Sequence, residues 1–333
     1  MSRDRSRRGL RRRDRNALIA ASLTALSLTA SGCVVVHGER EVLPAAGRAE
    51  AAKALRQFTD AYNRADKAYD RSLDAKYVTG PLADIDGARL KAGHANSPSG
   101  NANHSPLELT DAKFTIPKKA GWPRWFVADA KGNKGNKGGN ARWLLVFTRD
   151  GLGEPWRVAY LTLVAQGDVP EFRTDADGYA EAVPAGSTGL AVPPAELSKG
   201  YTGHLKNGGN TFADGPYTST LRTNRKKLAK RPGLVRQFID EPLTSGDYAP
   251  LALRTADGGA LVFFTTHHYE KQTAAAGTSV PTPNRDVQAL TKGEIKQSLT
   301  LEIIANEAAL DPAGGGRVSV LGRVQGLTAA QGE

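Results

Sequence analysis

The densest group of chemically competent side chains lies in His267-His268-Tyr269-Glu270. Histidine and glutamate often move protons in catalysis, so this run could supply an acid–base pair to a pocket. The flanking residues predict a strand, in which neighbouring side chains point to opposite faces. His267 and Tyr269 would then share one face, so the two histidines cannot hold one metal ion together. The alternative interpretation is a strand end that emerges into solvent.

Four tryptophans fall in the first half of the chain, and aromatic walls suit apolar or sugar ligands. One interpretation is therefore a ligand pocket lined by His267, Tyr269, Trp125, Trp143 and Trp156; the other is ordinary core packing. The chain has no Gly-x-Ser-x-Gly, His-Glu-x-x-His, phosphate-binding loop or dinucleotide fingerprint. We therefore assign no catalytic residue and expect no metal and no cofactor.

The only cysteine, Cys33, follows Leu28-Thr29-Ala30-Ser31-Gly32. Residues 1–16 hold eight arginines and two aspartates, and residues 17–30 carry no charge. As a helix, the uncharged run would span roughly 21 Å, which is too short for a stable membrane crossing. A basic start, a short apolar run and small residues are typical of a signal peptide. The Cys33 thiol is the group that could take a lipid.

Residues 1–33 resemble the signal peptides of bacterial lipoproteins, although the family prefers leucine where this chain has Ala30. The resemblance implies cleavage before Cys33, attachment of diacylglycerol and palmitate to it, and a place on the outer face of the cytoplasmic membrane. A secreted form, an uncleaved anchor and a basic tail are the alternatives. Ser6–Arg11 also resembles a twin-arginine export signal, which leaves the export route open.

Net charge, apolar content and cysteine content exclude several classes of function. Of the net charge of +11, six units lie in residues 1–16, so the remainder is only +5 and nucleic acid is not an expected partner. Beyond the signal, no apolar run approaches the length of a membrane span. With Cys33 acylated, the chain has no disulfide and no cysteine zinc site. About 300 residues then remain, which suggests two domains.

Periodicity and turn residues predict the elements. After a tether at 34–45, the first half should contain helices at 46–74 and 82–91, a loop at 92–105, and strands at 107–116, 124–129, 142–149 and 156–164. After a linker at 166–192, the second half should contain helices at 193–205 and 218–230, strands at 234–239, 251–255, 260–270, 295–306 and 317–326, and a polar loop at 272–293.

This order resembles the nuclear transport factor 2-like cone, in which a curved antiparallel sheet wraps a long helix. The likeness is closest over 46–165, where Trp156–Tyr160 looks like a late strand of the cone. It implies an α+β fold with two tandem cones, 46–165 and 193–333. The runs at 123–148 and 250–265 share a pattern that favours duplication. The whole chain also resembles uncharacterised lipoproteins of actinobacteria, and no functional residue carries over from either family.

The sequence thus predicts a membrane-anchored extracytoplasmic lipoprotein that acts as a non-enzymatic binding or scaffolding module of the cell envelope. Its expected partners are the membrane, through the lipid on Cys33, and an envelope protein or anionic envelope polymer. The basic run Arg222–Arg236 could meet such a polymer or be a solvated helix face. The alternative function is a small-molecule-binding or enzymatic cone with a pocket near His267 and Tyr269.

Overall fold

The computed structural model describes residues 41–135 and 141–333. The predicted signal peptide, Cys33 and most of the tether lie outside the described residues. Val42–Glu333 forms one compact unit that contains both helices and sheets, so the α+β class is confirmed. None of the described helices is long and apolar enough to cross a membrane.

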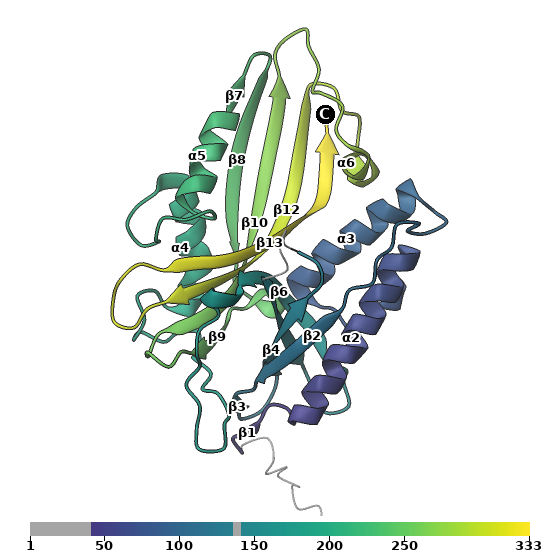
Figure 1. Ribbon diagram of the computed structural model, residues 1–333. Helices are drawn as coiled ribbons and strands as arrows, with labels where there is room; N and C mark the ends of the chain where they lie inside the picture. The colour runs from purple at the N-terminus through teal and green to yellow at the C-terminus, as the bar shows by residue number, and fades with distance from the viewer. Residues whose placement is uncertain (1–40, 136–140) are drawn as a thin grey trace, which may run out of the picture. The chain divides into compact units, whose positions relative to one another are not determined.

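Besides short 3-10 helices, the first half supplies eight α-helices and β-strands among the described residues, drawn in Figure 1. They are β1 (Leu43–Pro44), α2 (Arg48–Ala68), α3 (Gly80–Asn96), β2 (Leu109–Thr115), β3 (Lys118–Lys119), β4 (Arg124–Gly132), β5 (Ala141–Arg149) and β6 (Arg157–Ala165). Strands β2, β4, β5 and β6 form a four-stranded antiparallel sheet in that order, and β1 pairs separately with β3.

The second half supplies the larger sheet, three α-helices and a short 3-10 helix, Gly246–Tyr248, among the described residues. The α-helices and strands are α4 (Pro194–Asn207), α5 (Ser219–Leu228), β7 (Lys230–Arg231), β8 (Leu234–Leu243), β9 (Leu251–Arg254), β10 (Ala260–Ala274), α6 (Arg285–Leu290), β11 (Thr291–Lys292), β12 (Ser298–Asp311) and β13 (Ser319–Gly332). The strand order is β11-β13-β12-β10-β8-β7, with β9 also paired to β10.

The two sheets pack against each other, with helices on their outer faces. On the outer face of the first sheet, Phe58 of α2 packs against Phe147. On its inner face, Trp125 belongs to the same apolar cluster as Phe263 of the second sheet. Helix α4 covers the other face of that second sheet through Tyr201 and its neighbours. Burial on both faces explains the apolar runs in these strands, Trp125–Ala128 of β4, Trp143–Phe147 of β5 and Ala260–Phe264 of β10.

The segment expected as a linker, 166–192, lies along β9 and joins the two sheets. The Arg173 amide donates to the Arg254 carbonyl at 3.0 Å, and the Val183 amide donates to the Ala252 carbonyl at 2.8 Å. The Ala180 amide donates to the Ile116 carbonyl at 2.8 Å, on the side of the first sheet. A division into two domains at this segment stays a prediction, as does the tandem-cone arrangement.

Several element boundaries differ from the predictions. Helix α2 ends at Ala68 because Tyr69 adopts a left-handed conformation, with φ of 50°, and a separate 3-10 helix, Arg71–Leu73, follows. Helix α3 runs on to Asn96, through part of the predicted loop. The predicted polar loop at 272–293 contains α6, whose first turn is capped by the Asn284 side chain accepting from the Val287 amide at 3.0 Å.

Candidate functional site

A line of hydrogen-bonded polar side chains is buried on the α5 side of the second sheet. We call it the relay, and its members are Asp240, His268, Thr266, Glu307 and Arg323. His268 Nδ1 lies 2.5 Å from Asp240 Oδ1, and His268 Nε2 lies 2.7 Å from Thr266 Oγ1. Thr266 Oγ1 also donates to Glu307 Oε1 at 2.8 Å, and Arg323 Nε donates to the same oxygen at 3.3 Å.

Strand register brings these residues together. His268 of β10 lies directly opposite Asp240 of β8, and Glu307 of β12 lies opposite Arg323 of β13. Thr266 is two residues before His268, so both side chains point to the same face of the sheet. The relay therefore crosses four adjacent strands, and residues distant in sequence become neighbours.

The charged side chains of the relay are buried, and each has a hydrogen-bonding partner. The side chains of His268, Asp240 and Glu307 are 3%, 5% and 0% exposed. Arg225 of α5 donates to both Asp240 oxygens, at 2.9 and 2.7 Å. Burial acts to raise the pKa of Asp240, but the hydrogen bond from His268 and the Arg225 guanidinium outweigh it and hold that pKa below its usual value.

The order Thr–His–Asp has the hydrogen-bond pattern of a nucleophile, its base and an orienting carboxylate. Thr266 is fully buried, however, and its hydroxyl already donates to Glu307. If that hydroxyl donates to Glu307, its proton is not directed at His268 Nε2, so the imidazole is not placed as the base that would activate it. The arrangement holds charges in fixed places and does not present a nucleophile to a substrate.

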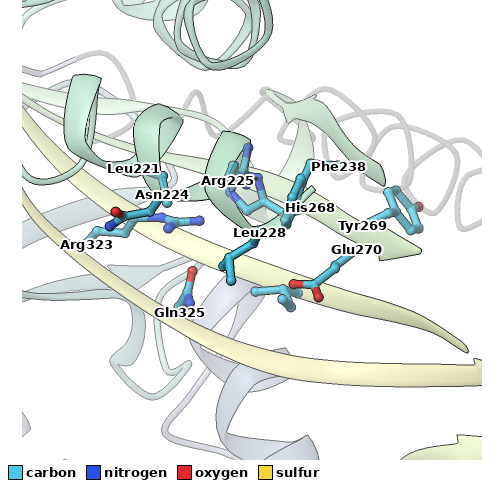
Figure 2. Close-up of a pocket in the computed structure, with 11 residues that line it drawn as sticks. Leu221, Asn224, Arg225, Leu228, Phe238, His268, Tyr269, Glu270, Arg323 and Gln325 are labelled. Carbon is cyan, nitrogen blue, oxygen red and sulfur yellow. Dashed lines mark hydrogen bonds between the residues drawn. The ribbon is translucent and has the colours of Figure 1, made fainter. Parts of the chain in front are cut away.

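A small pocket lies above the relay, between α5 and the sheet (Figure 2). Its volume is about 150 Å³, and it is lined by Leu221, Asn224, Arg225, Leu228, Phe238, His268, Tyr269, Glu270, Ile303, Arg323 and Gln325. Thr266 is not among these residues. Pockets for drug-sized ligands are roughly 300–1,000 Å³, so this one suits only a small molecule.

His267 and Tyr269 lie on the opposite face of β10 from the relay, as the alternation of a strand requires. Their rings are 4.3 Å apart, and His267 Nε2 is 3.7 Å from Glu302 Oε2. Burial lowers the pKa of His267, although Glu302 and Glu241 oppose that change. Burial and the same two carboxylates raise the pKa of Tyr269. Tyr269 points away from the other pocket residues in Figure 2.

The three predicted pocket tryptophans are buried, and they divide between the two faces of the first sheet. Trp125 lies in the apolar cluster between the sheets, whereas Trp143 and Trp156 lie in the cluster beneath α2. The Trp143 indole donates to the Lys134 carbonyl at 3.0 Å, and the Trp156 indole donates to Glu50 Oε1 at 3.0 Å. The structure does not bring these side chains together with His267 and Tyr269.

The basic run that begins at Arg222 separates into inner and outer side chains. Arg225 pairs with Asp240, and Arg236 Nε lies 2.9 Å from Glu270 Oε1. Four other side chains are exposed, two on α5 and two on β7, and we call them the basic surface: Lys226, Lys227, Lys230 and Arg231. None of the four makes an ion pair with any residue of the described chain.

Sequence reasoning missed Asp240, Thr266, Glu307 and Arg323. The available signal was Asn306-Glu307, a polar pair inside the apolar run of β12. An isolated carboxylate in such a run is expected to be buried beside a partner. Among the described residues, no group of three or more histidine, cysteine, aspartate and glutamate side chains is placed to hold a metal ion.

Comparison with known proteins places the compact unit in a family. Residues 42–332 match the family described as "Domain of unknown function (DUF8094)". The chain belongs to this family. No solved structure matches it.

Three relatives from Streptomyces are similar over nearly the whole chain. An uncharacterized lipoprotein of Streptomyces coelicolor is 73% identical over the full length of both proteins. An uncharacterized lipoprotein of Streptomyces avermitilis is 60% identical, again over both full lengths. A second uncharacterized lipoprotein of Streptomyces coelicolor is 25% identical and covers 91% of this chain and 90% of its own length.

Proposed function

We propose that this chain is a lipoprotein, anchored by lipid on Cys33 to the outer face of the cytoplasmic membrane, that binds an anionic polymer of the cell envelope without catalysing a reaction. Two relatives that match over their full length are named lipoproteins, which supports the anchor. The small residues before Cys33 and the basic and apolar segments upstream agree with it.

The observation that carries the binding role is the basic surface. Its four cations lie within six residues of sequence and are exposed, while Arg225 and Arg236 of the same run turn inward to carboxylates. A group of like charges without carboxylates beside it produces a local positive potential. Such a potential attracts polyanions, and the attraction weakens as salt rises.

The relay supports a role without catalysis. Its hydroxyl is buried, and its histidine is held between Asp240 and Thr266. Fixed charges of this kind hold Arg225, and with it α5, against the sheet. The basic surface on α5 and β7 is therefore presented by a rigid support rather than by a loose helix.

The anchor is tested by replacing the lipid-bearing residue. We expect Cys33→Ala to move the protein from the membrane fraction to the soluble extracytoplasmic fraction, with the processed parent remaining on membranes. Cell fractionation with mass measurement of the N-terminal peptide is the readout. A parent protein that carries no lipid at Cys33 would refute the anchor.

The binding role is tested by charge removal at matched sites. A variant with glutamine at Lys226, Lys227, Lys230 and Arg231 should lose retention on isolated cell walls and on inorganic polyphosphate by about tenfold or more at low salt. The control removes four other exposed cations: Arg56, Lys91, Lys113 and Lys131. Sedimentation assays at several salt concentrations measure both. An equal loss in the two variants would contradict a specific surface.

A second candidate function is binding of a small molecule in the pocket above the relay. Arg323 favours it, because only its Nε bonds to Glu307 while the side chain also lines the pocket. A volume of about 150 Å³ would accept a small carboxylate or a similar anion. Calorimetric titration with such anions, repeated on Arg323→Lys, separates this function from the first.

A further inference from the structure

The end of the compact unit where the chain enters carries exposed apolar side chains. Val42 is 63% exposed and Leu43 is 38% exposed. They begin the described unit, and Leu43 pairs with Lys119 of β3. Figure 1 shows β1 and β3 together at one end, near the start of β4.

A third exposed apolar side chain, that of Leu152, comes to the same end by strand register. Arg149, the last residue of β5, lies opposite Arg124, the first residue of β4. Arg124 Nη1 in turn donates to the Pro44 carbonyl at 3.4 Å, next to Leu43. Leu152 is three residues beyond Arg149, so their Cα atoms are at most about 11 Å apart. Leu152 is 90% exposed, the highest value among the large apolar side chains of the described residues.

Trp122 lies against two arginines at the same end of the unit. The guanidinium carbons of Arg124 and Arg149 lie 4.9 and 5.2 Å from the centre of the Trp122 ring. Lys119 is close enough that burial and the Arg124 charge both lower its pKa. Tryptophan and basic residues together are the side chains that favour the boundary between lipid and water.

The carboxylates at this end are largely neutralised. Glu50 accepts from Arg149 at 2.8 Å, Asp150 pairs with Arg157, and Lys118 pairs with Asp175 and Asp177. Glu41 and Glu154 are the exposed exceptions. Among the described residues, Lys119 and Arg124 form no ion pair, so their charges remain available to an anion outside the protein.

We propose that this end rests directly on an anionic lipid bilayer; its entry face consists of Val42, Leu43, Lys119, Trp122, Arg124 and Leu152. The inference rests on the proposed lipid at Cys33. Eight residues separate Cys33 from Val42, so a fully extended chain holds Val42 within about 30 Å of the lipidated residue. The anchor already keeps these apolar side chains and unpaired cations close to the lipid head groups. Their contact with the bilayer therefore costs little additional translational entropy.

The experiment uses the full chain, lipidated and reconstituted in phosphatidylcholine vesicles with or without phosphatidylglycerol. Cys33 is the only cysteine, so Leu152→Cys offers one free thiol for an environment-sensitive fluorophore once Cys33 carries lipid. The matched position is Ala276→Cys, in the exposed turn after β10. We expect the label at 152 to be quenched by spin-labelled lipid and shielded from iodide, and the label at 276 to behave oppositely.

Removing charges from the entry face tests whether it prefers anionic lipid. Lys119→Gln, alone and with Arg124→Gln, should weaken docking on phosphatidylglycerol vesicles about fivefold for each charge, whereas Lys226→Gln with Lys227→Gln should not. An anchored chain whose label at 152 is as open to iodide as the label at 276 would overturn the inference. A second labelled thiol, at Cys33, would instead overturn the lipid anchor and the inference that rests on it.

Discussion

Buried carboxyl groups in this chain are stabilised in two ways, and Asp74 shows the less common one. Asp240 has arginine and histidine beside it, whereas Asp74, 2% exposed, lies next to a second carboxyl group, that of Asp86. Arg89 bonds to Asp86, at 2.9 and 2.8 Å, and not to Asp74. Burial, a hydrogen bond with Asp86 and the Asp86 charge raise the pKa of Asp74 to about 8.

This raised pKa gives a definite dependence of stability on pH. The folded chain keeps a proton on Asp74 that the unfolded chain releases near pH 3.8, so folding stability falls between about pH 4 and about pH 8. Asp74→Asn, which stays neutral, should unfold several degrees above the parent at about pH 8 and close to it at about pH 4. Thermal unfolding followed by circular dichroism measures the difference.

Asp70 provides the control of opposite sign. It is exposed, and hydrogen bonds from Ser72 lower its pKa, so its contribution to stability is present at neutral pH and is lost in acid. The unfolding temperature of Asp70→Asn should therefore lie below that of the parent at neutral pH and approach it in acid. If the unfolding temperatures of Asp74→Asn and of the parent change with pH in parallel between about pH 4 and about pH 8, Asp74 is not protonated in the folded chain.

At the scale of elements, β13 and β6 approach each other closely where the two sheets meet. A Cβ atom on Gly322 would lie 2.5 Å from the Leu163 carbonyl oxygen, a backbone atom that cannot swing aside. The two strands contact each other over several residues. Glycine is thus required here by space and not by backbone conformation.

The same substitution at two glycines should have opposite effects. Gly322→Ala is expected to destabilise the protein by about 2 kcal/mol or more, because overpacking displaces a strand. Gly203→Ala, inside α4 with no atom within 4 Å of the added carbon, should stabilise it by about 1 kcal/mol. Urea denaturation gives both values. A destabilised Gly203→Ala together with an unchanged Gly322→Ala would contradict the packing described.

The sequence predicted individual elements better than their assembly. Strands β5 and β6 were expected within one residue of their observed bounds, because their apolar runs mark both ends, whereas β4 and β10 continue beyond their predicted ends through polar residues. The alternation that separates His267 from His268 was likewise predictable. The relay was not, because it depends on which strands become neighbours and in which register. A pairing such as Glu307 with Arg323 is set by the whole sheet and by no local pattern.

At the scale of the whole molecule, the apolar cluster between the sheets decides how the chain should unfold. That cluster takes Val146 and Tyr160 from the first half and Leu261 and Phe263 from the second. Separating the halves would expose both faces of it to water, which is unfavourable in proportion to the apolar area. The contacts accordingly group Val42–Glu333 as one unit.

Calorimetry should therefore show one cooperative unfolding transition. We expect the calorimetric and van't Hoff enthalpies to agree for the lipid-free chain, with fluorescence and circular dichroism giving the same midpoint. Two resolved transitions would instead favour the division into domains at residues 166–192.

The position of β13 also constrains how the protein can fold while it is being synthesised. This last strand contacts α3 and β6, which are made about 220 and 150 residues earlier. Its end is held by Glu333, whose amide donates to the Ser298 carbonyl at 3.0 Å. Until β13 has been made, the surfaces of α3 and β6 that it covers are expected to remain exposed. Removing residues 322–333 is therefore expected to expose apolar side chains of the first half, against which Val324 and Leu327 pack, and to favour aggregation.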